Sequence, residues 1–231
     1  MIFTIFERKP VLMLSHILRP SNMAGKAERR VHRIYLGVLL TLFGCLIGLL
    51  GLYLTSCADA SLPQEALYRS YLDHTLLLVL NLLPPVLLAW LGSLLFGRCW
   101  CGVLLSGLFG VGLPLVSYYK VLLRGDPMRA SDLLLLRTAG GIMSQYDIEL
   151  TDPVNTAVTL FGAMLAFSVL LMPRARLRPR ARALGAAVCV LLGAGAYFGA
   201  YTNDAVYEET ANDDLINPWS ENEVYLSRGF V

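Results

Sequence analysis

A short charged stretch, "RGDPMRASDLLLLRTAGG" (124–141), holds the side chains of this chain with the clearest potential for chemistry. Its arginines suit a phosphate group, because a planar guanidinium donates two parallel hydrogen bonds to phosphate oxygens. The alternative is that Arg124 and Arg129 only extend from a membrane surface into water and balance the two aspartates. We take Arg124, Asp126, Arg129 and Asp132 as candidates for contact with a lipid headgroup.

The same stretch has the signals of a short helix. Asp126–Pro127 ends the preceding helix, because proline lacks a backbone donor and restricts the residue before it. Ser131 is a good N-cap, and Asp132 would lie in the first turn, where negative charge is favourable. The predicted helix, about 131–139, is too short to cross a bilayer, and its four adjacent leucines cover most of its surface. We therefore expect an interfacial or shallow re-entrant helix.

Long segments without charge surround this stretch and define the elements that position it. The chain is 56% hydrophobic and 16% charged, whereas soluble domains carry about 25% charged residues. Each of these segments is long enough for the roughly 20 apolar residues of a membrane-spanning helix, the form that satisfies the backbone within lipid. The sequence predicts an all-α polytopic membrane protein with a transmembrane domain over residues 34–203. Its five predicted spans are approximately 34–54, 75–96, 99–119, 153–172 and 183–201.

The distribution of positive charge predicts the orientation of these spans. Most of the 19 lysines and arginines fall in segment 1–33 and in the arginine run 174–182, which lie on the same side of a five-span protein. Cytoplasmic loops carry such an excess, so we expect segment 1–33 to be cytoplasmic and segment 204–231 to be extracellular. An arginine run between two spans is typical of a topology signal, and we expect no nucleic-acid partner.

One polar residue, Asn81, is expected inside a span, one turn before Pro84 and Pro85. The prolines remove two backbone donors and should kink the helix. An amide within a membrane faces protein or water rather than lipid. Asn81 either satisfies carbonyl groups freed by the kink or lines a polar cavity open to the outside. The second interpretation adds Asn81 to the lipid-headgroup candidates.

Pairs of glycines four residues apart predict where helices approach each other closely. Gly44 and Gly48 lie in the first span, and Gly195 and Gly199 lie in the last span, which is also rich in alanine. Small residues let helix backbones come close in a membrane, although glycine is common in membrane helices in any case. The first pair is either a packing face or only part of this general glycine content, and we expect the last span to be packed against its neighbours.

The sequence contains no recognisable set of catalytic or metal-binding residues. The three histidines are scattered, and no phosphate-binding loop, nucleophile elbow or zinc-protease motif is present. Cys99 and Cys101 lack the usual spacing of a metal site, so packing or a lipid anchor explains them better. No acidic residue falls within a span, which argues against a coupled pump or secondary transporter. We predict no catalytic residue, no metal site and no cofactor in this chain.

Several of these features together resemble a known family. The five spans, the kink segment "NLLPPVLL", the stretch "YYKVLLRGDPMRASDLLLL" after the third span and the tail "NEVYLSRGFV" look like the membrane half of lipoteichoic acid synthases. These enzymes are phosphoglycerol transferases of the alkaline phosphatase/sulfatase superfamily. The resemblance covers about residues 34–231 and is strongest at 126–136 and 225–230.

The resemblance implies a membrane-anchoring and lipid-presenting domain in a bacterial cell membrane. Family members take glycerol phosphate from phosphatidylglycerol at the outer leaflet. Their outer domain uses a threonine nucleophile and a divalent metal, usually manganese. We expect that domain to be absent from this chain, with 204–231 as the linker that leads to it, so no catalytic residue is carried over.

Two other classes of function stay open. The chain is alternatively a non-enzymatic membrane scaffold, or a partner subunit of a separately encoded sulfatase-like enzyme. The glycine pairs and the acidic tail would then serve assembly with that partner or in an oligomer. A lipid or small-solute transporter is less well supported, because the spans show neither an inverted repeat nor an internal charge.

Overall fold

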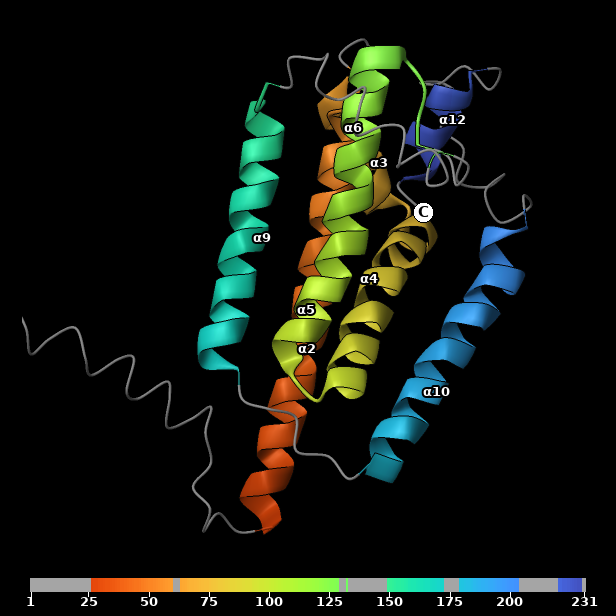
Figure 1. Cartoon of the computed structure of the whole chain (residues 1–231). Coiled ribbons are helices and arrows are strands. Elements are labelled where there is room, and N and C mark those ends of the chain that lie inside the picture. The colour runs from red at the N-terminus through yellow and green to blue at the C-terminus, as the bar shows by residue number, and fades with distance from the viewer. Residues whose placement is uncertain are drawn as a thin grey trace, which may run out of the picture.

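Five long apolar helices make up most of the chain, which confirms the predicted all-helical membrane fold (Figure 1). The computed structural model describes residues 26–59, 63–128, 132, 149–172, 179–203 and 220–229. Within these residues, the helices long and apolar enough to cross a membrane are Ile34–Ser56, Thr75–Phe96, Cys99–Arg124, Asp152–Leu171 and Pro179–Tyr201.

The five spans lie side by side, and two short helices lie at one end of them (Figure 1). The spans are α2 (Lys26–Ser56), α4 (Thr75–Phe96), the continuous series α5 (Cys99–Gly107), η1 (Leu108–Gly112) and α6 (Leu113–Arg124), α9 (Asp152–Leu171), and α10 (Pro179–Ala196) with its extension η2 (Tyr197–Tyr201). The short helices are α3 (Gln64–Asp73) and α12 (Glu221–Arg228). We call their end of the bundle the α12 end, and the opposite end, where a turn joins α4 to α5, the Gly97 end. In Figure 1, α9 and α10 flank the central helices α2, α4 and α5–α6.

The third span is longer than predicted. The prediction ended it near residue 119, before the first charged side chains, whereas the helix continues to Arg124. Gly125 then ends the helix with a left-handed φ of +74°. The π-helical turn η1 precedes Pro114, whose ring would clash with the carbonyl of Gly110 in a regular α-helix. The charged end of α6 is therefore helical, which fixes where Lys120 and Arg124 lie relative to the apolar span.

The glycine pair in the first span is a packing face, one of the two alternatives that the sequence left open. A Cβ atom at Gly44 would lie 2.7 Å from the Cα of Val86, and one at Gly48 would lie 2.6 Å from a methyl carbon of Leu82. The backbones of α2 and α4 therefore meet at a distance that no other residue allows. An equally close approach joins α4 to α5, where a Cβ at Gly92 would lie 2.9 Å from the Cα of Gly102.

The last span meets its prediction only in part. α10 packs along α4, but no residue of α10 is buried. No described atom lies within 4 Å of a Cβ built on Gly195 or Gly199, so this glycine pair faces away from the bundle. Contact with α4 is made instead near the Gly97 end by Arg182, whose guanidinium donates to the carbonyl of Leu94 at 2.6 Å. Small residues let two helices approach closely, but close packing also needs a neighbouring helix that faces them.

A carbonyl of α4 that loses its usual donor to Pro84 is satisfied from a helix distant in sequence. Pro84 has no N–H to donate to the carbonyl of Leu80. The hydroxyl of Tyr201, at the end of the last span, donates to that carbonyl at 2.6 Å. A carbonyl freed by the kink is therefore satisfied by a tyrosine, whereas the sequence suggested Asn81 for this role.

The glycine contact between α2 and α4 gives a direct test. Gly44→Val should lower the midpoint of thermal unfolding by about 3–10 °C, because overpacking costs about 1–3 kcal/mol. Gly195→Val is the matched control, since it adds the same side chain to a position with open space. Unfolding followed by circular dichroism in detergent micelles measures both shifts, and equal shifts would contradict the packing face.

The orientation of the bundle is a separate prediction. A cysteine at Asp126, at the α12 end, should react with a membrane-impermeant maleimide on intact cells. A cysteine at Arg180, at the Gly97 end, should react only after the cells are opened. Both substitutions are made in a chain whose five own cysteines are replaced by alanine. The reverse pattern would place segment 1–33 outside and overturn the predicted orientation.

Candidate functional site

The C-terminal helix α12 is docked onto the α12 end of the bundle (Figure 1). Ser220 caps it by accepting a hydrogen bond from the backbone N–H of Glu223, and Leu226 is fully buried. The phenol of Tyr71, on α3, donates to the carbonyl of Leu226. Burial of a leucine contributes about 2 kcal/mol, so this helix is a packed part of the bundle end. The sequence assigned these residues to a linker and predicted no helix there.

A chain of hydroxyl groups joins α12 to two spans. Thr55 on α2 donates to the carbonyl of Gly51 at 3.0 Å, and the phenol of Tyr225 hydrogen-bonds both Thr55 and Ser117. Ser117 in turn accepts from the backbone N–H of Met128 at 3.1 Å. The chain therefore links α2, α12, α6 and the turn that follows α6.

Both tyrosines of this interface are neutral donors at neutral pH. Burial raises the pKa of Tyr225, and the hydrogen bonds to Ser117 and Thr55 lower it by less. Burial, with a further contribution from Tyr225, raises the pKa of Tyr71 well above its ordinary value. The docking of α12 through these phenols therefore needs no charged group.

Asn81 fixes the other end of α12. Its amide nitrogen donates to the carbonyl of Leu77 at 2.9 Å and to the carbonyl of Arg228 at 2.9 Å, and the residue is only 1% exposed. Gly229 follows with φ +91°, and a Cβ there would lie 2.6 Å from the same amide nitrogen. Asn81 thus receives the C-terminal end of a helix, where carbonyl groups lack partners within the helix.

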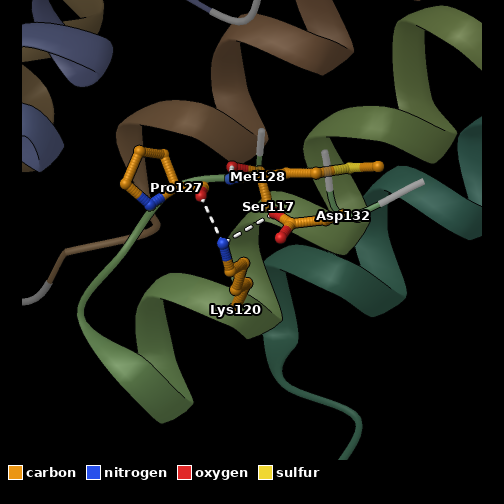
Figure 2. Close-up of polar contacts among 5 residues, drawn as sticks. All are labelled: Ser117, Lys120, Pro127, Met128 and Asp132. Atoms are coloured by element: carbon orange, nitrogen blue, oxygen red, sulfur yellow. Dashed lines mark hydrogen bonds and ion pairs between the residues drawn. The ribbon is translucent and has the colours of Figure 1, made fainter. Parts of the chain in front are cut away.

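The turn after α6 forms a compact charged site (Figure 2). The ammonium of Lys120 donates to the carbonyl of Pro127 at 2.8 Å and forms an ion pair with Asp132 at 2.7 Å. The Lys120 side chain is 19% exposed and the Asp132 side chain 28% exposed, so the pair lies partly buried at the surface. Figure 2 shows Lys120 pointing toward the turn, and the hydroxyl of Ser117, on the same helix, accepts from the backbone N–H of Met128. This site can present a positive charge to an anion near the membrane surface.

The predicted headgroup candidates are only partly brought together. Arg124 and Asp126 are exposed on either side of Gly125, and Asp132 pairs with Lys120. Asn81 lies beneath α12. Arg129 lies outside the described residues, as does all of the predicted helix 131–139 except Asp132, whose backbone is helical.

Two groups of this site were not predicted from the sequence. Lys120 was not among the predicted candidates, because its carboxylate partner lies 12 residues further along the chain. Helix α12 did carry a readable signal: Ser220 and Glu223 form the S-x-x-E spacing of a capping box, and Arg228–Gly229 is a typical helix end. Nothing in the sequence indicated that this helix docks onto Asn81.

Comparisons with protein-family models, with curated proteins and with solved structures give no match. The fold and the site together define a multi-span helical membrane protein with a polar, partly charged end. Within the described residues, no group of three or more histidine, cysteine, aspartate or glutamate side chains could hold a metal ion.

The glycine after α12 tests the docking. Gly229→Ala should increase amide hydrogen exchange over residues 224–228 by about tenfold or more, because the new methyl group would push α12 away from Asn81. Gly125→Ala is the matched control: Gly125 also has a positive φ, but no described atom lies within 4 Å of its Cβ position. Exchange measured by mass spectrometry in detergent should change over α12 only in the first variant. The same change in both variants would contradict the role of the contact.

Proposed function

We propose that this chain is a membrane-anchoring and lipid-presenting unit, similar to the membrane part of lipoteichoic acid synthases. It would hold phosphatidylglycerol at the outer leaflet of a bacterial cell membrane. The observation that carries this proposal is that α12 and the turn after α6 share one hydrogen-bonding group, the hydroxyl of Ser117.

The anchoring part of the proposal rests on the docking of α12. A domain attached after α12 in a longer protein would leave the bundle from a fixed position, because the helix is held by Tyr71, Asn81 and the buried Leu226. Such a domain would then lie near the end of α6, which carries Lys120 and Arg124. Fixed position is useful to an enzyme that acts on a lipid, since holding reactants in place lowers the entropic cost of reaction.

The lipid-presenting part of the proposal rests on the charges at the end of α6. Lys120 ends in a partly buried ammonium, and the exposed Arg124 lies one helical turn further along. Cations at headgroup depth attract anionic lipids, by about 1 kcal/mol for each lysine or arginine. Phosphatidylglycerol carries one negative phosphate and no compensating cation, so this end of the bundle favours it over a zwitterionic lipid.

The family part rests on the sequence segments "RGDPMRASDLLLL" and "YLSRGF", of which the second contains α12 residues that contact the bundle. The threonine nucleophile and the manganese ion of such transferases would belong to their outer domain. This chain would supply the anchor and the lipid.

Lipid retention tests the proposal. The purified chain, placed in nanodiscs of equal parts phosphatidylglycerol and phosphatidylcholine, should retain phosphatidylglycerol preferentially when it is released for native mass spectrometry. The double variant Arg124→Ala with Arg129→Ala should lose most of that preference. Arg69→Ala is the matched control, because Arg69 is an exposed cation on α3 at the same end of the bundle.

Equal retention of both lipids by the unaltered chain would overturn the lipid-presenting role. A preference unaffected by the double variant would show that the lipid binds elsewhere. Stable co-purification with a separately encoded sulfatase-like protein, without a lipid preference, would instead support the partner-subunit function.

A further inference from the structure

We propose that Lys120 is the group that binds the headgroup phosphate, and that Asp132 occupies the same position as an internal competing anion. This inference rests on the proposed function and assigns the site within it. The ligand class is a phosphate ester with a net negative charge, either as part of a lipid or free in solution. Arg124, which the sequence favoured together with Arg129, would then be an auxiliary cation one helical turn from Lys120.

The position of the ammonium does not depend on Asp132. Lys120 stands on helix α6, and its ammonium also donates to the carbonyl of Pro127 at 2.8 Å. Pro127 is buried, and the backbone of the next residue, Met128, is held by Ser117 at 3.1 Å. The helix and this pinned turn would keep the ammonium in place when the carboxylate leaves (Figure 2).

Asp132 is the second partner of the ammonium. It lies 12 residues after Lys120 in the sequence and forms an ion pair with it at 2.7 Å (Figure 2). A phosphate oxygen accepts the same hydrogen bonds as a carboxylate oxygen, so it can replace Asp132 without changing the geometry at the ammonium. An ammonium that is 19% exposed needs an anionic or polar partner, and Asp132 supplies it when no phosphate is bound.

The place of the pair matches the depth of a headgroup. Lys120 lies in the last two turns of the span Cys99–Arg124, with Val121 buried beside it and the exposed Arg124 one turn beyond. The C-terminal end of a helix carries a partial negative charge that favours a cation there. The Asp132 side chain is 28% exposed, so an incoming phosphate reaches the pair from the membrane surface.

Variants that remove one charge of the pair test this exchange in the full chain. Asp132→Asn keeps an oxygen that can accept from Lys120 but removes the competing charge, so retention of phosphatidylglycerol should rise about fivefold, the factor that corresponds to a partly exposed ion pair. Lys120→Gln should reduce retention to the level of phosphatidylcholine, and Lys120→Arg should preserve it. Glu65→Gln is the matched control, because it removes a carboxylate from the exposed pair Arg69–Glu65 at the same end.

A second arm separates the two sources of phosphate. In nanodiscs of phosphatidylcholine alone, millimolar glycerol phosphate should raise the unfolding midpoint of Asp132→Asn and leave that of Lys120→Gln unchanged if the site accepts the free ester. A rise in phosphatidylglycerol retention without this response would assign the site to the lipid. Size-exclusion profiles verify that each variant is folded, and Asp132→Asn with Lys120→Arg carry the test if Lys120→Gln does not fold.

The two proposals fail in different ways. No preference for phosphatidylglycerol in the unaltered chain would overturn the proposed function. A preference that is lost with Arg124 and Arg129 but is unchanged in Asp132→Asn and Lys120→Gln would overturn only the assignment of Lys120. Lower stability without any change in retention would show that the Lys120–Asp132 pair is structural alone.

Discussion

The structure depends on how α4 satisfies its backbone around two prolines inside a membrane. Lipid offers no hydrogen-bond partners, so a carbonyl freed by a proline must find a donor within the protein. The hydroxyl of Tyr201 reaches the carbonyl of Leu80, which ties the end of the last span to the kink. This contact is made near the α12 end, whereas Arg182 ties the same span to α4 near the Gly97 end. Two hydrogen-bonding side chains therefore hold a span that buries none of the residues of α10.

The close packing of the other helices follows from the same constraint. Without a hydrophobic driving force between helices in lipid, close backbone contact must supply the association energy. Gly44 and Gly48 bring α2 against the part of α4 around its two prolines. Gly102 brings α5 against the C-terminal half of α4. These contacts fix the positions of Thr55 and Asn81, the residues that hydrogen-bond to α12. The docking site for α12 is thus a consequence of glycine packing deeper in the bundle.

The spans could be predicted from the sequence because each is a local property: a stretch of about 20 residues without charge. The helix against which each span packs could not be predicted from the sequence. Gly44–Gly48 and Gly195–Gly199 have the same spacing, yet among the described residues the first pair alone meets another helix, because contact also depends on the surface of the partner. The role of Asn81 depends on a carbonyl 147 residues away, which no local pattern encodes. The capping box of α12 was readable, and a search for helix signals outside the apolar segments would have found that helix.

In the candidate site, the hydrogen bonds that hold α12 are separate from the charged pair Lys120–Asp132. The chain from Met128 through Ser117, Tyr225 and Thr55 consists of neutral hydrogen bonds, which salt screens little, whereas the Lys120–Asp132 pair is partly exposed and sensitive to ions. The two systems meet at α6, which carries both Ser117 and Lys120, and at the turn that contains Pro127 and Met128. That turn is held by the hydroxyl of Ser117 and by the ammonium of Lys120. If a lipid phosphate binds Lys120 as proposed, this arrangement would let the phosphate exchange while Tyr225 keeps α12 in place.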